Sequence, residues 1–241
     1  MFDHVTIRVS DRLASQRFYN AVLDTLGIPM TDQADDLPEW EDFSLLAAEE
    51  ASRVTERLHI GFAAHSRPEV DVFRRTGVDL GARDDGAQGS RPQYRDYPQG
   101  GFLLDPDGNT AEAAHVGSRR EDGVIDHIRL RVSDIAASTA FYATVGRVAG
   151  HQFAEASPAH TVIRGASGSM SLAAGTPSRN VHIAFPVDDD ATVDAFHAVA
   201  TGAGHPSNGE PGERTEYHAG YYGAFVLDPD GNNIELVNHN R

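Results

Sequence analysis

Cysteine and lysine are both absent from this sequence, and each absence excludes a class of chemistry or partner. Without cysteine there is no disulfide and no thiolate ligand, so any bound metal ion must be held by nitrogen and oxygen atoms. All twenty basic side chains are arginine, and 36 acidic residues give the 241-residue chain a formal net charge of −16. This charge repels phosphate backbones and anionic lipid head groups, so we expect neither nucleic acid nor a membrane as a partner.

Long hydrophobic runs are missing as well. The first residues, MFDHVTIRVSDR, contain no apolar stretch of the kind found in signal peptides, and no run of eighteen apolar residues follows. The sequence therefore predicts neither a secretion signal nor a membrane span, and we expect the protein in the cytoplasm. Its 40% hydrophobic residues are enough to build a sizeable core.

What the chain does contain is an internal repeat with an offset of 123 residues. The polar segment GSRREDG, residues 117–123, has the composition of a linker and joins the two copies. We therefore predict an N-terminal module at residues 1–119 and a C-terminal module at residues 120–241. The matching segments are DHVTIRVSD (3–11) with DHIRLRVSD (126–134), LHIGF (58–62) with VHIAF (181–185), and FLLDPDGNTAE (102–112) with FVLDPDGNNIE (225–235).

Each copy shows the pattern of a strand, a helix and further strands, twice over. Val5, Ile7 and Val9 alternate with polar residues, as in a half-buried strand, and Ser10 or Asp11 can cap the helix that follows. The pattern predicts an α+β fold in which each module is made of two βαβββ units. Further strands are expected at 42–47, 58–64, 93–97, 101–104, 110–114, 215–218, 224–227 and 233–237, a helix cap at Asp134, and second helices at 67–77 and 189–202.

The DPDGN segments at 105–109 and 228–232 have the chemistry of a turn, because proline follows aspartate and glycine comes two residues later. A calcium loop needs a longer series of oxygen ligands. We therefore predict that both segments connect two strands and bind no ion. His239 and the other histidines near loops or chain ends are expected on the solvated surface.

Three polar residues recur in each copy on strands that are otherwise mostly apolar, with separations of 55 and 53 residues in both copies. Strand alternation turns them away from the face that packs on the helices and toward one concave face of a sheet. Two imidazoles and one carboxylate on one side of a divalent ion leave positions open for water and substrate, as in a facial triad. The predicted metal ligands are His4, His59 and Glu112 in the first copy, and His127, His182 and Glu235 in the second.

The surroundings of these residues favour metal binding over a merely solvated sheet face. Beside Glu112 and Glu235 the neighbouring residues differ between the two copies, while the carboxylate is present in both. Next to the second histidine of each copy the side chains on the same face are small, at Gly61, Ala63 and Ala184. We expect this arrangement to leave room for a ligand.

On these segments the sequence resembles a tandem member of the vicinal oxygen chelate superfamily, also called the glyoxalase/bleomycin resistance/dioxygenase superfamily. The resemblance covers nearly the whole chain and is carried by the three pairs of matching segments. It implies modules of paired βαβββ units that curl into a partly open barrel around a metal ion, with the ligands at the six positions given above. The superfamily includes lyases, isomerases, dioxygenases and metal-free drug-binding proteins, so the fold does not name the reaction.

The end motif of the dioxygenase branch is similar to HAGYYGAFVLDPDGNNIE, residues 218–235. The resemblance places a catalytic histidine at His218, but Phe225 stands where that motif has a tyrosine. In the first copy the histidine is replaced by Arg95, which cannot act as a base but can bind a carboxylate. Aromatic walls for a substrate are expected from Tyr217, Tyr221 and Tyr222.

Two functions of different classes remain open from the sequence. One is a metalloenzyme in which Fe, Mn, Zn, Ni or Co binds two neighbouring oxygens of a small-molecule substrate, with His218 as the available base. The other is a non-catalytic protein that shelters a drug or metabolite in the same barrel. Metal content separates them, because sequestration needs no ion. Formation of a homodimer and the number of filled metal sites are left open.

Overall fold

In the computed structural model the chain forms two compact units, which we name by the half of the sequence that supplies most of each. The N-unit comprises Thr6–Ile128, and the C-unit comprises Met1–Val5 together with Arg129–Arg241. The residues described by the structure are 1–31, 37–50, 52–85, 101–115, 123–157 and 159–241. The predicted linker, apart from Gly123, lies outside them, and the division into modules at residue 119 stays a prediction.

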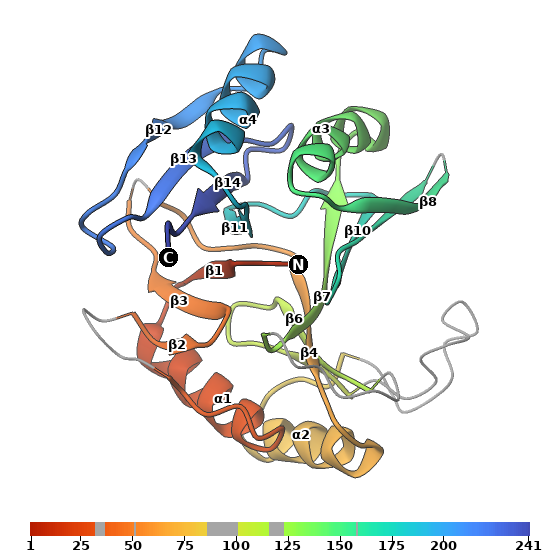
Figure 1. Cartoon of the computed structure of the whole chain (residues 1–241). Coiled ribbons are helices and arrows are strands. Elements are labelled where there is room, and N and C mark those ends of the chain that lie inside the picture. The colour runs from red at the N-terminus through yellow and green to blue at the C-terminus, as the bar shows by residue number, and fades with distance from the viewer. Residues whose placement is uncertain (32–36, 51, 86–100, 116–122, 158) are drawn as a thin grey trace. The chain divides into compact units, whose positions relative to one another are not determined.

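In the N-unit the helices α1 (Arg12–Asp24) and α2 (Arg67–Asp79) lie side by side and contact each other (Figure 1). Strand β1 starts in the C-unit and continues into the N-unit, and β7 does the reverse. The strands in this part of the chain are β1 (His4–Val9), β2 (Glu39–Trp40), β3 (Phe43–Ala47), β4 (His59–Ala63), β5 (Gly101–Leu104), β6 (Thr110–Ala114) and β7 (Ile125–Val132).

The C-unit repeats this plan with helices α3 (Ile135–Val148) and α4 (Asp190–Gly202), which also contact each other. Among the described residues no helix is both long enough and apolar enough to cross a bilayer. The further strands of this unit are β8 (Gln152–Ser157), β9 (His160–Arg164), β10 (Ser169–Ala174), β11 (Val181–Pro186), β12 (Ser207–Glu213), β13 (Tyr222–Leu227) and β14 (Asn233–Asn238).

The strands form two sheets of equivalent order. One runs β12-β13-β14-β11-β1-β3-β2 and the other runs β5-β6-β4-β7-β10-β9-β8. In both sheets the strand of the second histidine pairs in parallel with the strand of the glutamate, as β11 with β14 and as β4 with β6. This is the α+β arrangement with two modules that the sequence predicts.

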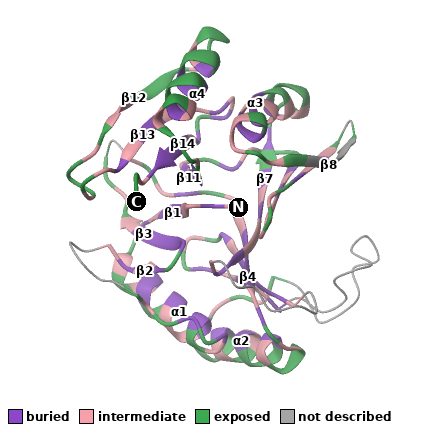
Figure 2. Cartoon of the chain, viewed as in Figure 1, coloured by how far each residue is buried: buried purple, intermediate pink, exposed green. Residues whose placement is uncertain are grey.

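The helices form where the sequence predicts them, because their caps and apolar faces are local features. Asp11, not Ser10, caps α1 by accepting a hydrogen bond from Ala14 N, and Asp134 caps α3 in the same way. Figure 2 shows the buried residues of α1 on one side of the helix and exposed residues on the other. That side includes the fully buried Tyr19, whose ring centroid lies 4.8 Å from that of Phe43.

Both DPDGN segments form turns, held by the first aspartate of each. In the C-unit the Asp228 carboxylate accepts bonds from the backbone N–H groups of Asp230 and Asn232 at 2.9 and 2.8 Å, and from the Tyr142 hydroxyl at 2.9 Å. Asp105 and Tyr19 repeat this arrangement in the N-unit. The prediction of turns is confirmed.

The same turns fix the neighbouring strands in register. The side chain of Asn232, the last residue before β14, accepts a hydrogen bond from Val181 N and donates one to Ser178 O, at 3.2 Å each. It thereby ties the start of β11 to the start of β14. Asn109 ties the starts of β4 and β6 in the same way, through Leu58 N at 3.0 Å.

The strand expected at residues 215–218 is wrong. The edge strand of this sheet is β12, Ser207–Glu213, and residues 215–217 form a turn after it. Gly209, Pro211 and Gly212 hid β12 in the sequence, but an edge strand with register shifts tolerates proline and glycine. The corresponding prediction in the first copy, at 93–97, lies outside the described residues.

We expect Tyr142→Phe to lower the free energy of unfolding by about 1.5–3 kcal/mol, the usual value of a hydrogen bond to a charged group. The Tyr142 hydroxyl is buried and donates to the buried Asp228 carboxylate. Urea unfolding followed by circular dichroism would measure the change. The matched control is Tyr222→Phe, because the Tyr222 hydroxyl donates to Asp194 at the exposed surface and its loss should have little effect. Equal effects of the two substitutions would contradict a supporting role for the turn.

Candidate metal centres

In the C-unit, strand pairing places His182 and Glu235 on one face of the sheet. Ala184 of β11 lies directly opposite Glu235 of β14, and His182, two residues before Ala184, projects from the same face. The start of β1 runs beside β11, where Asp3 N donates a hydrogen bond to Ala184 O at 2.9 Å. This contact places His4, the next residue, beside His182.

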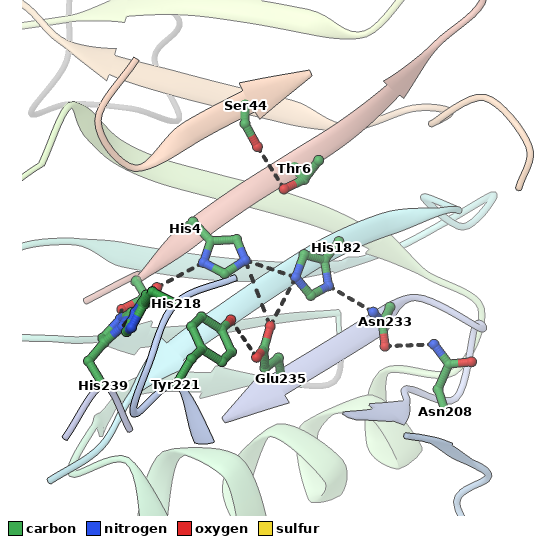
Figure 3. A network of polar contacts seen from close by, with 11 residues as sticks. His4, Thr6, Ser44, His182, Asn208, His218, Tyr221, Asn233, Glu235 and His239 are labelled. Carbon is green, nitrogen blue, oxygen red and sulfur yellow. Dashed lines mark hydrogen bonds and ion pairs between the residues drawn. The ribbon is translucent and has the colours of Figure 1, made fainter. Parts of the chain in front are cut away.

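Three possible ligand atoms meet there, as Figure 3 shows. Nε2 of His4 lies 3.0 Å from Nε2 of His182. Glu235 Oε2 lies 3.2 Å from His182 Nε2 and 3.7 Å from His4 Nε2. The glutamate is buried while both imidazoles remain partly exposed, so the group can be reached from solvent. We call these three residues the C-triad.

The N-unit contains an equivalent group, the N-triad, formed by His59, Glu112 and His127. The two Nε2 atoms lie 3.2 Å apart, and Glu112 Oε2 lies 2.8 Å from His59 Nε2 and 3.3 Å from His127 Nε2. Gly61 of β4 lies opposite Glu112 of β6, so the register repeats that of the C-unit. Both triads therefore have the same composition and similar geometry.

The structure corrects the grouping of the six predicted ligands. The sequence grouped His4 with His59 and Glu112, and His127 with His182 and Glu235, but the histidines of the first strands are exchanged. The reason is strand pairing, since the start of β1 lies beside β11, and the start of β7 lies beside β4, where Ala63 N donates to Val124 O at 2.9 Å. Each triad thus combines residues from both copies of the repeat.

The expectation that small residues leave room for a ligand is also wrong at Gly61 and Ala184. A Cβ atom on Gly61 would collide with the ring of His127. In the C-unit, Ala184 is buried with Tyr221 and Val237. Gly61 makes room for the imidazole of His127 in the N-unit, and Ala184 is buried beside Tyr221 in the C-unit.

Both groups of donor atoms fit a divalent ion. An ion about 2.1 Å from three ligands at right angles would hold those ligands about 3.0 Å apart. The measured separations in the two triads run from 2.8 to 3.7 Å. His4 and His127 each have Nδ1 2.8 Å from the preceding aspartate, Asp3 or Asp126. A proton on Nδ1 leaves the Nε2 lone pair free for a metal ion.

Without an ion the N-triad keeps an extra proton. Burial acts to lower the pKa of His127, but hydrogen bonds to Asp126 and Glu112 outweigh it and raise this pKa to about 9. Burial acts to raise the pKa of Glu112, and hydrogen bonds with His127 and His59 lower it to about 2. The carboxylate is therefore ionised and the imidazole pair is protonated at neutral pH.

Tyr221 is the residue that fixes the glutamate of the C-triad. Its hydroxyl donates a hydrogen bond to Glu235 Oε1 at 2.7 Å, while Oε2 faces the two imidazoles (Figure 3). Burial and the Glu235 charge raise the pKa of Tyr221, so the phenol keeps its proton. A Cβ atom on Gly223 would lie 2.6 Å from Glu235 Oε1, so glycine is needed beside this contact.

The other predicted substrate residues lie in different places. Tyr217 is 62% exposed and its ring contacts that of Tyr221 edge-on, whereas the Tyr222 hydroxyl donates to Asp194 of α4. Phe225 pairs with Glu235 across the strands and its ring lies 6.0 Å from that of His182. Arg95 lies outside the described residues.

The sequence predicted that His218 lies on a strand beside Glu235. In the structure His218 is not part of a strand. It follows the turn after β12, with Nδ1 2.8 Å from Ala219 O and Nε2 2.9 Å from Nδ1 of His239. His239 in turn contacts Asp3, so the expectation of a merely solvated His239 is wrong. To take a proton from a substrate, His218 would first have to leave these partners.

Sequence reasoning missed three residues that contact the ligands. Asp3 and Asp126 precede the first-strand histidines, and the repeated dipeptide Asp-His was the signal that pointed to them. The amide nitrogen of Asn233 lies 2.8 Å from His182 Nδ1 and donates to it, while the Asn233 oxygen accepts from the Asn208 amide at 3.0 Å. Its counterpart in the repeat is Thr110, so the repeat gave no signal for this contact.

The comparisons with known proteins bear on the fold. Residues 124–236 match the family model of the Glyoxalase/Bleomycin resistance protein/Dioxygenase superfamily. This part of the chain is similar to that superfamily. No curated protein sequence matches the chain.

Solved structures extend the likeness in fold over the whole chain. Glyoxalase I from Zea mays is 16% identical, with a TM-score of 0.73, and the match covers 99% of this chain and 92% of that one. A putative dioxygenase from Bacillus subtilis subsp. subtilis str. 168 is 11% identical, with a TM-score of 0.65, over 100% and 85% of the two chains. At these identities the likeness shows the fold, and the predicted fold with two modules is confirmed.

The exchange of histidines predicts which pairs of substitutions damage the same site. Protein with His4→Ala and Glu235→Ala should keep one equivalent of a divalent ion, because both substitutions remove ligands from the C-triad. Protein with His4→Ala and Glu112→Ala should lose tight binding at both sites, because each triad then lacks one ligand. Elemental analysis after incubation with excess Co²⁺ and gel filtration measures the difference, with wild-type protein as the control. If instead the variant with His4→Ala and Glu112→Ala kept one equivalent and the variant with His4→Ala and Glu235→Ala lost both, each site would be formed within one copy of the repeat.

Metal affinity at the N-triad should rise with pH. The pKa of His127 is about 9 in the metal-free site, so below pH 9 an ion must displace a proton from the imidazole pair. We expect the apparent affinity for Co²⁺ to increase about tenfold per unit between pH 6 and pH 8. Titration of the Glu235→Ala variant, which retains only the N-triad, measures this slope. An affinity that does not change over this range would contradict the protonated apo state.

Proposed function

We propose that this protein is a divalent-metal-dependent enzyme that acts on a small molecule through two neighbouring oxygen atoms. The observation that carries the proposal is the convergence of two imidazole Nε2 atoms and one carboxylate oxygen in each unit. Buried or half-buried groups of this kind are costly to hold together without a cation. The ion would be Fe, Mn, Zn, Ni or Co, because only nitrogen and oxygen ligands are offered.

Of the two triads, we propose the C-triad as the working site. His4, His182 and Glu235 would supply three ligands and leave further coordination positions for a substrate. A bound divalent ion would supply Lewis acidity to the two substrate oxygens. The buried hydroxyl of Tyr221 holds the second oxygen of Glu235, so the carboxylate keeps its orientation during a reaction.

The surroundings of the C-triad suggest an aromatic or extended apolar substrate. The ring of Phe225 lies 6.0 Å from that of His182, and the Arg214 guanidinium carbon lies 5.7 Å from the centre of the Phe225 ring. A cation beside an aromatic wall favours a substrate that also carries negative charge. The reaction would be of the lyase, isomerase or dioxygenase type, and a role of His218 in proton transfer stays a prediction.

Turnover should depend on the C-triad and not on the N-triad. Reconstituted wild-type protein would be screened against catechols with dioxygen and against thiol adducts of 2-oxoaldehydes, two substrate classes with neighbouring oxygens. We expect Glu235→Gln to lower kcat/KM by about a hundredfold or more, because it removes a charged ligand of the working ion. The matched variant Glu112→Gln should retain most of the activity.

Two outcomes would contradict this proposal. Equal activity of Glu235→Gln and wild type would place the working site elsewhere. Tight binding of these compounds by metal-free protein, without turnover in the presence of any of the five ions, would identify a sequestering protein instead. Circular dichroism of each variant verifies that the fold is intact.

A further inference from the structure

A chain of four side chains leads away from the C-triad on the side of His4. Asp3 bridges two histidines, with Oδ1 2.8 Å from Nδ1 of His4 and Oδ2 2.6 Å from Nε2 of His239. Nδ1 of His239 lies 2.9 Å from Nε2 of His218. Figure 3 shows the rings of His218 and His239 together on one side of His4 and Tyr221. The sequence of contacts is therefore His4, Asp3, His239 and His218.

Both ring nitrogens of His218 have partners. Its Nδ1 lies 2.8 Å from the backbone oxygen of Ala219, which can only accept. Its Nε2 lies 2.9 Å from Nδ1 of His239 and 3.4 Å from the Arg241 guanidinium. His239 is therefore held by His218 at Nδ1 and faces Asp3 with Nε2.

The Asp3 carboxylate contacts one imidazole with each of its oxygens, His4 with Oδ1 and His239 with Oδ2, so it cannot turn without losing both contacts.

The neighbouring side chains hold the ring of His239 in place. The His239 side chain is 28% exposed and that of Asp3 is 15% exposed. The ring of His239 stacks on that of His218 at an interplanar angle of 17°, and the ring of Tyr221 meets it edge-on at 5.3 Å. The charged groups facing His239 are Asp3 and, across the His218 ring, Arg241.

We propose that His239 is a positioning residue of the C-triad, which holds the Asp3 carboxylate and thereby orients His4 with its Nε2 lone pair toward the ion. With one oxygen held by His239, the Asp3 carboxylate cannot turn away from His4 Nδ1. His4 then keeps its proton on Nδ1 and presents Nε2 to His182 and Glu235. The inference rests on the proposed metal site.

The repeat supplies a contrast to this arrangement. Asp126 bonds to His127 in the N-unit at the same distance as Asp3 to His4, 2.8 Å. At the positions 123 residues before His239 and His218, however, the sequence has Val116 and Arg95. The first copy therefore has no pair of imidazoles at these two positions of the sequence.

Metal titration in two backgrounds tests the inference, with Co²⁺ as the probe. Glu112→Ala leaves the C-triad as the intact site, and Glu235→Ala leaves the N-triad. His239→Ala should weaken Co²⁺ binding about tenfold or more in the first background, the usual cost of losing a group that orients a ligand. It should not change the affinity in the second background. His239→Gln, which keeps a donor toward Asp3, should recover part of the loss.

A spectroscopic measurement separates positioning from mere structural support. In ¹⁵N-labelled wild-type protein without metal at pH 7, His4 should carry its proton on Nδ1. In His239→Ala, His4 should distribute its proton between Nδ1 and Nε2. Circular dichroism and the unchanged second background verify that the variant is folded.

The outcomes distinguish this inference from the proposed function. If Co²⁺ binds in both backgrounds and His239→Ala changes neither affinity, the positioning role is wrong while the metal sites stand. A His4 ring that keeps its proton on Nδ1 in His239→Ala would likewise overturn it. If Co²⁺ does not bind in the Glu112→Ala background, the assignment of the C-triad as a metal site fails, and the positioning role fails with it.

Discussion

The pairing of β1 with β11, and of β7 with β4, is the constraint on which both candidate centres depend. The backbone hydrogen bond from Asp3 N to Ala184 O sets the start of β1 against β11. It places His4 within 3.0 Å of His182 and brings Asp3 to His239. One register shift would turn the side chain of His4 to the opposite face of the sheet, so this alignment decides whether a triad exists at all.

The DPDGN turns fix the strands that carry the other two ligands of each triad. Each turn lies far along the chain from the first histidine, yet its last asparagine joins the start of the strand with the second histidine to the start of the strand with the glutamate. The buried tyrosines Tyr19 and Tyr142 hold the turns to the helices through Asp105 and Asp228. A motif that the sequence marks only as a turn therefore contributes to the geometry of the ligands.

The parts of the fold that the sequence predicted are those set by neighbouring residues. Alternation identified β1, the caps Asp11 and Asp134 identified the helix starts, and the repeat identified all six candidate ligands. The exchange of His4 and His127 was not predictable, because DHVTIRVSD and DHIRLRVSD are nearly equivalent and either can pair with either partner strand. Strand β12 was missed because glycine and proline conceal an edge strand, and His239 was missed because its partner, Asp3, is 236 residues away.

The exchange also bears on how such a chain could have arisen and diverged. A half-length ancestor would carry a first-strand histidine that its own second strand and glutamate do not use, and two such halves related by a twofold axis would complete two identical centres. Joining the halves in one polypeptide removes the need for identical sequences. Mutations such as the one that distinguishes His239 from Val116 can then act on one centre while the other keeps its ligands. Fusion thus turns a symmetric pair of sites into two that selection can adjust separately.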